Sequence, residues 1–343
     1  MRHLRTAIAV VAAIIALGAC SVAHPGTPKA GPSTRNVAEE LDNTKESDLR
    51  KVFTSSAQQV NDYWNSDRMR DAKPRQPQPG GGDVPKDEPA GVVIQPTTGP
   101  VGPTKPLPSD STGSVWSRAG LSASTVGRLY MSWGAVSSVC SASVVNSSSG
   151  VLVATAAHCI WDTFRGWGWA DNVMFIPGDT NRQGPYGRWV AESIYAPSQF
   201  TATAKATETS TSGDGWAYDI AFLRMRPLGG KNIRDALGGQ GIAFDAKAES
   251  VRSIGYPTMP PFDGSTMRSC SSPTWTANRN NTFTMPCVMT PGCSGGPWYT
   301  RFDDDRGVGY LVSTNSTGDR TRINGSLLGK VAYDIYKRAD SGA

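Results

Sequence analysis

The sequence predicts an all-β domain built from short strands and many turns. Only 18% of the 343 residues are charged, 37 are glycine, and long amphipathic patterns are few. Short apolar stretches such as 139–145 and 151–153 are separated by clusters of Ser, Gly and Asn. Strands bounded in this way are typical of β-sandwiches and β-barrels. Residues 327–337 are expected to form a closing helix.

Residues 1–19 predict a signal peptide. A basic start precedes an apolar run from Ala7 to Ala19, which is shorter than the roughly 20 residues that a transmembrane helix needs. The run ends in Leu17-Gly18-Ala19-Cys20, which resembles the lipobox of bacterial lipoproteins. In that family the cysteine is acylated and becomes the mature N-terminus. We therefore expect export and lipidation of Cys20, with an ordinary secretory signal peptide as the alternative.

Three further segments are expected before the folded domain. Residues 20–35 are small and polar, like a tether. Apolar residues recur at helical spacing within 36–70, which predicts an amphipathic helix that packs on the main domain or binds a partner. A marginal helix in a disordered tether is the alternative. Residues 71–114 are dense in proline and glycine and predict a largely disordered spacer, so the folded domain is expected over 115–343.

A turn with a serine lies at residues 290–298, Thr-Pro-Gly-Cys-Ser-Gly-Gly-Pro-Trp. Gly295 and Gly296 follow Ser294, and Pro297 then imposes an extended backbone. Glycine in such a turn lets the backbone take a positive φ and approach a ligand closely. A nucleophilic serine in acyl transfer needs this approach, because nearby N–H groups must point at the developing oxyanion. Taken alone, the stretch also fits a strand-connecting turn.

The chain has three histidines, and only His158 lies in the expected domain, because His3 and His24 precede it. This count excludes a histidine metal cluster, and we expect neither metal nor cofactor. An apolar strand leads into the turn that contains His158, and a disulfide between Cys159 and Cys140 can hold this turn in place. Such a disulfide closes a loop of about 20 residues and stabilises the fold by about 3 kcal/mol. A histidine here supplies the general base that a serine nucleophile needs.

Asp219 opens an otherwise apolar strand, which predicts that its carboxylate is carried into the interior. A buried carboxylate is costly unless it is paired, and pairing with the imidazole of His158 would satisfy it and fix the tautomer of the ring. Asp214 is the competitor, but glycines flank it and no apolar run follows it directly.

These three stretches together resemble the signatures of chymotrypsin/trypsin-like serine proteases, in the His, Asp, Ser order of that family. They are Thr155-Ala156-Ala157-His158-Cys159, Asp219-Ile220-Ala221-Phe222-Leu223 and Gly292-Cys293-Ser294-Gly295-Gly296-Pro297. The resemblance covers residues 115–338 and implies two antiparallel Greek-key β-barrels with the site in the cleft between them. It implies His158 as base, Asp219 as orienting acid and Ser294 as nucleophile.

The resemblance places the oxyanion hole at the N–H groups of Gly292 and Ser294. Cys293 is the rival nucleophile, as in cysteine variants of this fold. The hole uses the N–H groups of the nucleophile and of the residue two before it. For Cys293 that second residue is Pro291, which has no N–H. Because losing one donor costs about 3 kcal/mol of transition-state stabilisation, Ser294 is favoured.

The sequence also departs from the animal enzymes of this family. Those enzymes carry an aspartate just before the serine, which pairs with a new N-terminus, and here Cys293 stands in that place. The chain is more similar to the bacterial, glutamyl-endopeptidase-like branch, although the pocket histidine of that branch is absent. Nothing in the expected specificity pocket is negative, so a preference for Arg or Lys is not expected. The residues expected to line the pocket are Val288, Met289, Ser313, Thr314 and Asn315.

The remaining cysteines leave two pairings open. Cys270 and Cys287 are expected to form the second bridge and to leave Cys293 free, with a Cys287–Cys293 bridge as the rival. Disulfides persist in the oxidising compartment that export implies. Residues 303–305, three aspartates, fit a polar hairpin turn better than a calcium site.

The expected function is therefore a serine endopeptidase, exported and lipid-anchored at the cell surface, that acts on a protein or peptide as a monomer. The net charge of +5 without a long basic run gives no support for nucleic-acid binding. The alternative function is a non-catalytic surface lipoprotein that keeps the fold as a binding scaffold.

Overall fold

The computed structural model describes residues 49–75, 77–79, 87–244, 249–277 and 282–343. The predicted signal peptide, the tether and Cys20 lie outside the described residues. Within the described ranges, no helix has both the length and the apolar character needed to cross a bilayer.

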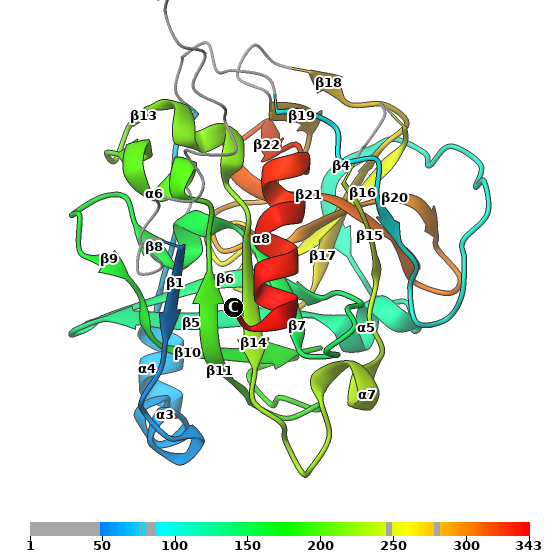
Figure 1. Ribbon diagram of the computed structural model, residues 1–343. Helices are drawn as coiled ribbons and strands as arrows, with labels where there is room; N and C mark the ends of the chain where they lie inside the picture. The colour runs from blue at the N-terminus through cyan, green and yellow to red at the C-terminus, as the bar shows by residue number, and fades with distance from the viewer. Residues whose placement is uncertain (1–48, 76, 80–86, 245–248, 278–281) are drawn as a thin grey trace, which may run out of the picture. The chain divides into compact units, whose positions relative to one another are not determined.

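The first half of the domain is a closed barrel of six strands (Figure 1). Its strands follow the order β10-β5-β6-β7-β14-β11, and pairing of β11 with both β14 and β10 closes the ring. The barrel strands are β5 (Val126–Trp133), β6 (Val136–Val144), β7 (Leu152–Thr155), β10 (Asp171–Pro177), β11 (Trp189–Tyr195) and β14 (Ala221–Met225).

The second half is a half-barrel in which β21 pairs with β20 and β22 at the centre. The prediction of an all-β domain with two barrel-like halves is confirmed, although this half remains open. Its strands are β4 (Asp110–Val115), β15 (Gly241–Ala243), β16 (Val251–Gly255), β17 (Arg268–Ser272), β18 (Thr276–Ala277), β19 (Thr282–Pro286), β20 (Pro297–Asp303), β21 (Val308–Gly318) and β22 (Arg322–Ser326).

Alternation along the strands explains how the first barrel fills its interior. Leu129 and Met131 on β5 belong to the cluster inside the barrel, whereas Tyr130 between them belongs to a cluster on the outer side. Successive side chains of a strand point to opposite faces, so β5 is covered on both faces. Burying each such side chain stabilises the fold by about 1.5–3 kcal/mol.

The described part of the expected 36–70 helix is not one helix. It contains β1 (Arg50–Val52), α3 (Ala57–Tyr63) and α4 (Ser66–Asp71). The side chain of Ser56 caps α3 and that of Asn65 caps α4, and residues of this kind start new helices because they accept from free N–H groups. Of the two alternatives left open by the sequence, these residues follow the first and pack on the domain. The buried side chains that form this contact are Val60, Trp64, Met69, Tyr130, Met174 and Val190.

The described residues of 71–114 also differ from the free spacer that their composition predicts. Strands β2 (Lys73–Pro74), β3 (Val93–Ile94) and β4 pair with β6, β15 and β17, respectively. Proline lacks an N–H group and is tolerated at sheet edges, so a proline-rich segment can still add short edge strands. The ordered domain therefore begins well before residue 115.

The predicted closing helix is α8 (Lys330–Ser341), which starts and ends slightly later than expected. It lies beside β14 (Figure 1). The rings of Tyr336 and Phe222 are in contact there. The other short elements are α5 (Leu121–Thr125), η1 (Ala157–Cys159), β8 (Trp161–Asp162), β9 (Gly168–Trp169), α6 (Ser198–Thr203), β12 (Lys205–Ala206), β13 (Thr211–Ser212), η2 (Asp214–Tyr218) and α7 (Ile233–Leu237).

A buried ion pair joins the segment after β2 to strand β8, which follows His158 in the chain. Arg75 Nη2 lies 2.9 Å from Asp162 Oδ1, and the guanidinium lies over the ring of Trp133. The other carboxylate oxygen accepts the N–H groups of Arg165 and Trp167. Burial alone would raise the pKa of Asp162, but the hydrogen bond and charge of Arg75 and these N–H groups hold that pKa below its ordinary value.

Replacing Arg75 with methionine is expected to lower the free energy of unfolding by about 3 kcal/mol, because a buried carboxylate is left without its cation. Since the folded-state pKa of Asp162 is lowered, this stabilisation is present above the ordinary carboxyl pKa and is lost as pH falls through the folded-state value. Denaturant unfolding measures the change, with Arg70→Met as control because the ion pairs of Arg70 are exposed. Equal effects of the two variants would contradict the role given to Arg75.

Candidate functional site

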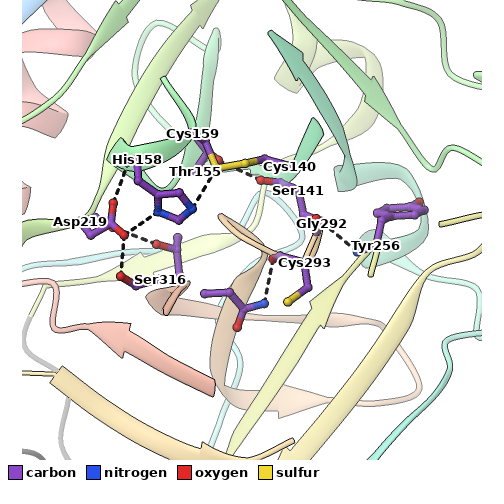
Figure 2. The surroundings of a disulfide bond; sticks show 12 residues. Cys140, Ser141, Thr155, His158, Cys159, Asp219, Tyr256, Gly292, Cys293 and Ser316 are labelled. Carbon is purple, nitrogen blue, oxygen red and sulfur yellow. Dashed lines mark hydrogen bonds and ion pairs between the residues drawn. A yellow bond between two sulfur atoms is a disulfide. The ribbon is translucent and has the colours of Figure 1, made fainter. Parts of the chain in front are cut away.

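The residue most strongly indicated by the sequence, His158, lies in η1 at the end of β7. The disulfide Cys140–Cys159 fastens this turn to β6. The Nδ1 atom of His158 lies 2.7 Å from Asp219 Oδ2, and its backbone N–H donates to Asp219 Oδ1 at 2.9 Å (Figure 2). His158 therefore contacts both carboxylate oxygens of Asp219, one through its ring and the other through its backbone N–H.

Asp219 is held where η2 gives way to β14. Its carboxylate is fully buried and accepts a further hydrogen bond of 2.5 Å from Ser316 Oγ. Its backbone N–H donates to Ser326 Oγ at 3.1 Å. The competitor Asp214 is exposed. A carboxylate with three donors is satisfied despite its burial, so the three hydrogen bonds fix its position beside His158.

The Ser294 turn lies against the strands that carry His158. Ser141 on β6 donates its N–H to the carbonyl of Ser294 at 2.7 Å. A Cβ atom at Gly295 would lie 2.1 Å from Thr155 Oγ1, so only glycine allows the turn to come this close. The structure therefore brings the three sequence stretches together at one place between the barrel and the half-barrel.

The hydroxyl of Ser294 is buried and has no hydrogen-bond partner among the described residues. It therefore makes no hydrogen bond to His158 in this structure. His158, Asp219 and Ser294 are each 0% exposed.

Two backbone donors of the turn, Gly292 N–H and Ser294 N–H, have no acceptor in the described part of the chain. Gly292 has a φ of +104°, a conformation that favours glycine. Between these residues lies Cys293, whose thiol is buried, and burial raises its pKa to about 12. A thiol with that pKa stays protonated at neutral pH and is a poor nucleophile.

The structure places the five expected pocket residues in the half-barrel. Met289 is fully buried and Val288 half-buried. On β21, Ser313 Oγ donates to the carbonyl of Ser326, and Thr314 Oγ1 donates to the carbonyl of Asp219. The side chain of Asn315 is also engaged within the protein, as described below. The assignment of these five residues to a specificity pocket stays a prediction.

Ser316 is a site residue that sequence reasoning missed. It lies in the stretch Ser-Thr-Asn-Ser-Thr at 313–317, where several hydroxyl residues follow one another and no pattern marks one of them. Only the position of the strand beside Asp219 shows which hydroxyl meets the carboxylate.

Of the cysteines in the described residues, Cys140 pairs with Cys159, Cys270 pairs with Cys287, and Cys293 is free. The rival bridge between Cys287 and Cys293 is not formed. The grouping of Cys140, His158 and Cys159 could geometrically suggest a metal site, but both sulfurs are in the disulfide and cannot act as thiolate ligands.

The three aspartates at 303–305 lie at the hairpin between β20 and β21. The side chain of Asp303 accepts the N–H groups of Asp305 and Arg306, and Asp304 pairs with Arg252 at 2.8 Å. These contacts are those of a polar hairpin turn, the interpretation that the sequence favours.

The structure of this chain is similar to solved structures of other proteins. No protein-family model and no curated protein sequence matches the chain. Protease Anisep from Arthrobacter nicotinovorans is similar with a TM-score of 0.57 and 30% identity, over 68% of this chain and 100% of that chain. A thermostable serine protease, AL20, from an extremophilic microorganism is similar with a TM-score of 0.56 and 28% identity, over 65% of this chain and 100% of that chain.

Both solved proteases are matched along their whole length by about two thirds of this chain. The barrel, the half-barrel and the meeting of His158, Asp219 and the Ser294 turn agree with this similarity. By this likeness to a solved relative at 30% identity, the chain belongs to the chymotrypsin-like serine proteases.

Proposed function

We propose that this protein is a serine endopeptidase that hydrolyses peptide bonds through Ser294, His158 and Asp219. The observation that carries the proposal is the buried pair of His158 and Asp219, which lies beside a serine turn with two N–H groups that have no acceptor among the described residues. A binding scaffold has no need for an imidazole oriented by a buried carboxylate.

In the proposed reaction, Ser294 Oγ attacks the carbonyl carbon of the scissile peptide bond while His158 Nε2 takes the hydroxyl proton. The negative charge that develops on the carbonyl oxygen is met by the N–H groups of Gly292 and Ser294. His158 then passes the proton to the leaving amine as the C–N bond breaks. Water, deprotonated by the same imidazole, attacks the acyl-enzyme, and the imidazolium returns this proton to Ser294 Oγ as the ester bond breaks and the acid is released.

Throughout this cycle, Asp219 stabilises the imidazolium and keeps Nδ1 protonated, because Oδ2 faces that atom at 2.7 Å. The donation from the backbone of His158 to Oδ1 prevents the carboxylate from turning away. No acidic side chain stands at Val288 or Met289, so substrates with Arg or Lys before the cut are not favoured. The bacterial, glutamyl-endopeptidase-like branch remains our proposed placement.

We also propose that the protease is exported and anchored to the membrane as a monomer through a lipid on Cys20, with a secreted form as the alternative. The support is the Leu-Gly-Ala-Cys ending of the apolar run. The mass of the mature N-terminal peptide distinguishes the two, since acylation adds the lipid to Cys20 and simple secretion does not.

Cleavage of a peptide library tests the proposed function. We expect the full chain to produce new peptide termini at defined sequences, and a His158→Ala variant that folds normally to produce none above background. The profile of residues around each cut also gives the specificity. Equal cleavage by the variant, or intact peptides with the folded wild type at every condition tried, would favour the scaffold.

A further inference from the structure

The turn that carries Ser294 has no ion pair next to the nucleophile. Cys293 occupies the neighbouring position, and its buried, protonated thiol cannot pair with a cation. The proposed oxyanion hole nevertheless requires that Gly292 N–H and Ser294 N–H keep a fixed direction. Other contacts of the described residues must therefore hold these two peptide groups.

The first peptide group joins Cys293 to Ser294. A trans peptide is planar, so its C=O and N–H point in opposite directions and fixing the carbonyl fixes the N–H. The carbonyl of Cys293 accepts Asn315 Nδ2 at 2.9 Å and the N–H of Gly296 at 2.9 Å. These two bonds set the direction of Ser294 N–H.

The second peptide group joins Pro291 to Gly292 and is held in the same way. The carbonyl of Pro291 accepts the N–H of Thr258 at 2.8 Å and Thr258 Oγ1 at 3.1 Å. A Cβ atom at Gly292 would lie 2.8 Å from the side chain of Thr258, so the threonine is packed tightly against the turn. Thr258 thus sets the direction of Gly292 N–H.

The amide of Asn315 is itself held in one orientation. Its Oδ1 accepts Ser253 Oγ at 3.0 Å and Trp298 Nε1 at 2.5 Å. The indole can only donate, so the oxygen must face it and the NH₂ group must face the carbonyl of Cys293. Asn315 is fully buried, and its backbone also bonds to Gly295 and Gly296.

We propose that Asn315 and Thr258 are positioning residues that clamp the two peptide groups of the oxyanion hole. Resting on the proposed function, this inference gives Asn315 a role different from lining a specificity pocket. The clamp does with neutral hydrogen bonds what an ion pair at the residue before the serine does in animal enzymes. Neither side chain touches the substrate, so both act through the backbone of the turn.

The test compares Asn315→Leu, Thr258→Val and Thr258→Ser, using the peptide that the full-length wild type cleaves fastest. We expect kcat to fall about 100-fold in Asn315→Leu and about tenfold in Thr258→Val, with KM within about threefold, because a misdirected donor loses transition-state contacts. Thr258→Ser keeps the hydroxyl and is expected to retain kcat within about threefold. Binding of the peptide aldehyde made from the acyl half should weaken in proportion to kcat/KM.

Ser271→Ala is the matched control, because it removes a buried hydroxyl on β17 that donates to the carbonyl of Pro108 and contacts neither peptide group of the turn. It should keep kcat within about threefold. The inference is overturned if Asn315→Leu keeps kcat, if only KM changes, or if Thr258→Val and Thr258→Ser behave alike. Should Asn315→Leu fail to fold, the two Thr258 variants still decide. An inactive wild type would contradict the proposed function itself, whereas unchanged variants of an active wild type contradict only the clamp.

Discussion

Ser294→Ala is expected to lower kcat by about 10⁶-fold, the size of loss that removal of a triad serine causes in other enzymes. The reason is that the acyl-enzyme forms only through the Ser294 hydroxyl, and the neighbouring thiol of Cys293 is buried and protonated. The fold should be retained, because Ser294 Oγ makes no hydrogen bond within the described residues. Steady-state hydrolysis of a cleaved peptide measures the loss.

Cys293→Ala is the matched control for this substitution. The thiol is buried and protonated, and Pro291 supplies no N–H for an oxyanion hole in that register. We therefore expect the Cys293 variant to keep kcat within about tenfold. If activity survives in the Ser294 variant and disappears in the Cys293 variant, the nucleophile has been assigned to the wrong residue.

Asp219→Asn is expected to lower kcat by about 10⁴-fold, as the same change does in a related triad. The geometry gives the reason. The backbone N–H of His158 donates to Oδ1, so the amide of the variant must keep its oxygen there and turn its NH₂ group toward Nδ1. The ring then carries its proton on Nε2 and cannot accept the proton of Ser294. Activity across pH and thermal unfolding together measure the effect.

Ser316→Ala is a milder change to the pair of His158 and Asp219 than Asp219→Asn. It removes one hydrogen bond to the carboxylate and leaves the contact of Asp219 with His158 in place. Because a hydrogen bond to a charged group contributes about 1.5–3 kcal/mol, the fall in kcat should be at most about a hundredfold. A smaller loss in Asp219→Asn than in Ser316→Ala would contradict the role given to Asp219.

The sequence was most informative where local chemistry decides the structure. Asp219 opens an apolar strand, and only a buried partner makes that placement stable. The structure places its carboxylate at His158. The two glycines after Ser294 predict a close approach of backbones, and Gly295 lies against Thr155. In these cases the type of residue restricts which partner or which backbone approach is possible at that position.

The sequence was less informative where distant strands decide the contact. Counting residues from Ser294 indicates which part of β21 passes the site, but a strand turns alternate side chains to opposite faces. An irregular register between Asn315 and Thr317 shifts this alternation, as bulges do. Distance along the chain therefore could not show that Asn315 faces the Ser294 turn and that Ser316 faces Asp219.

Composition was misleading for the described residues before 115. Proline and glycine predict a spacer over 71–114. A short pairing such as that of Lys73–Pro74 with β6 nevertheless forms, because it needs only a part of β6 that β7 leaves unpaired. Likewise, apolar spacing within 36–70 suggests one helix, whereas the caps at Ser56 and Asn65 divide the described part in two. Such edges are properties of the folded barrel and are not visible in the segment itself.

The most direct test of the account is to identify the residue that a small fluorophosphonate modifies. The probe is attacked only by an activated nucleophile, and mass spectrometry of the digested adduct locates the bond. The account predicts a single adduct on Ser294, formed by the wild type and absent in His158→Ala. An adduct on another residue, or equal labelling when the imidazole is missing, would contradict it.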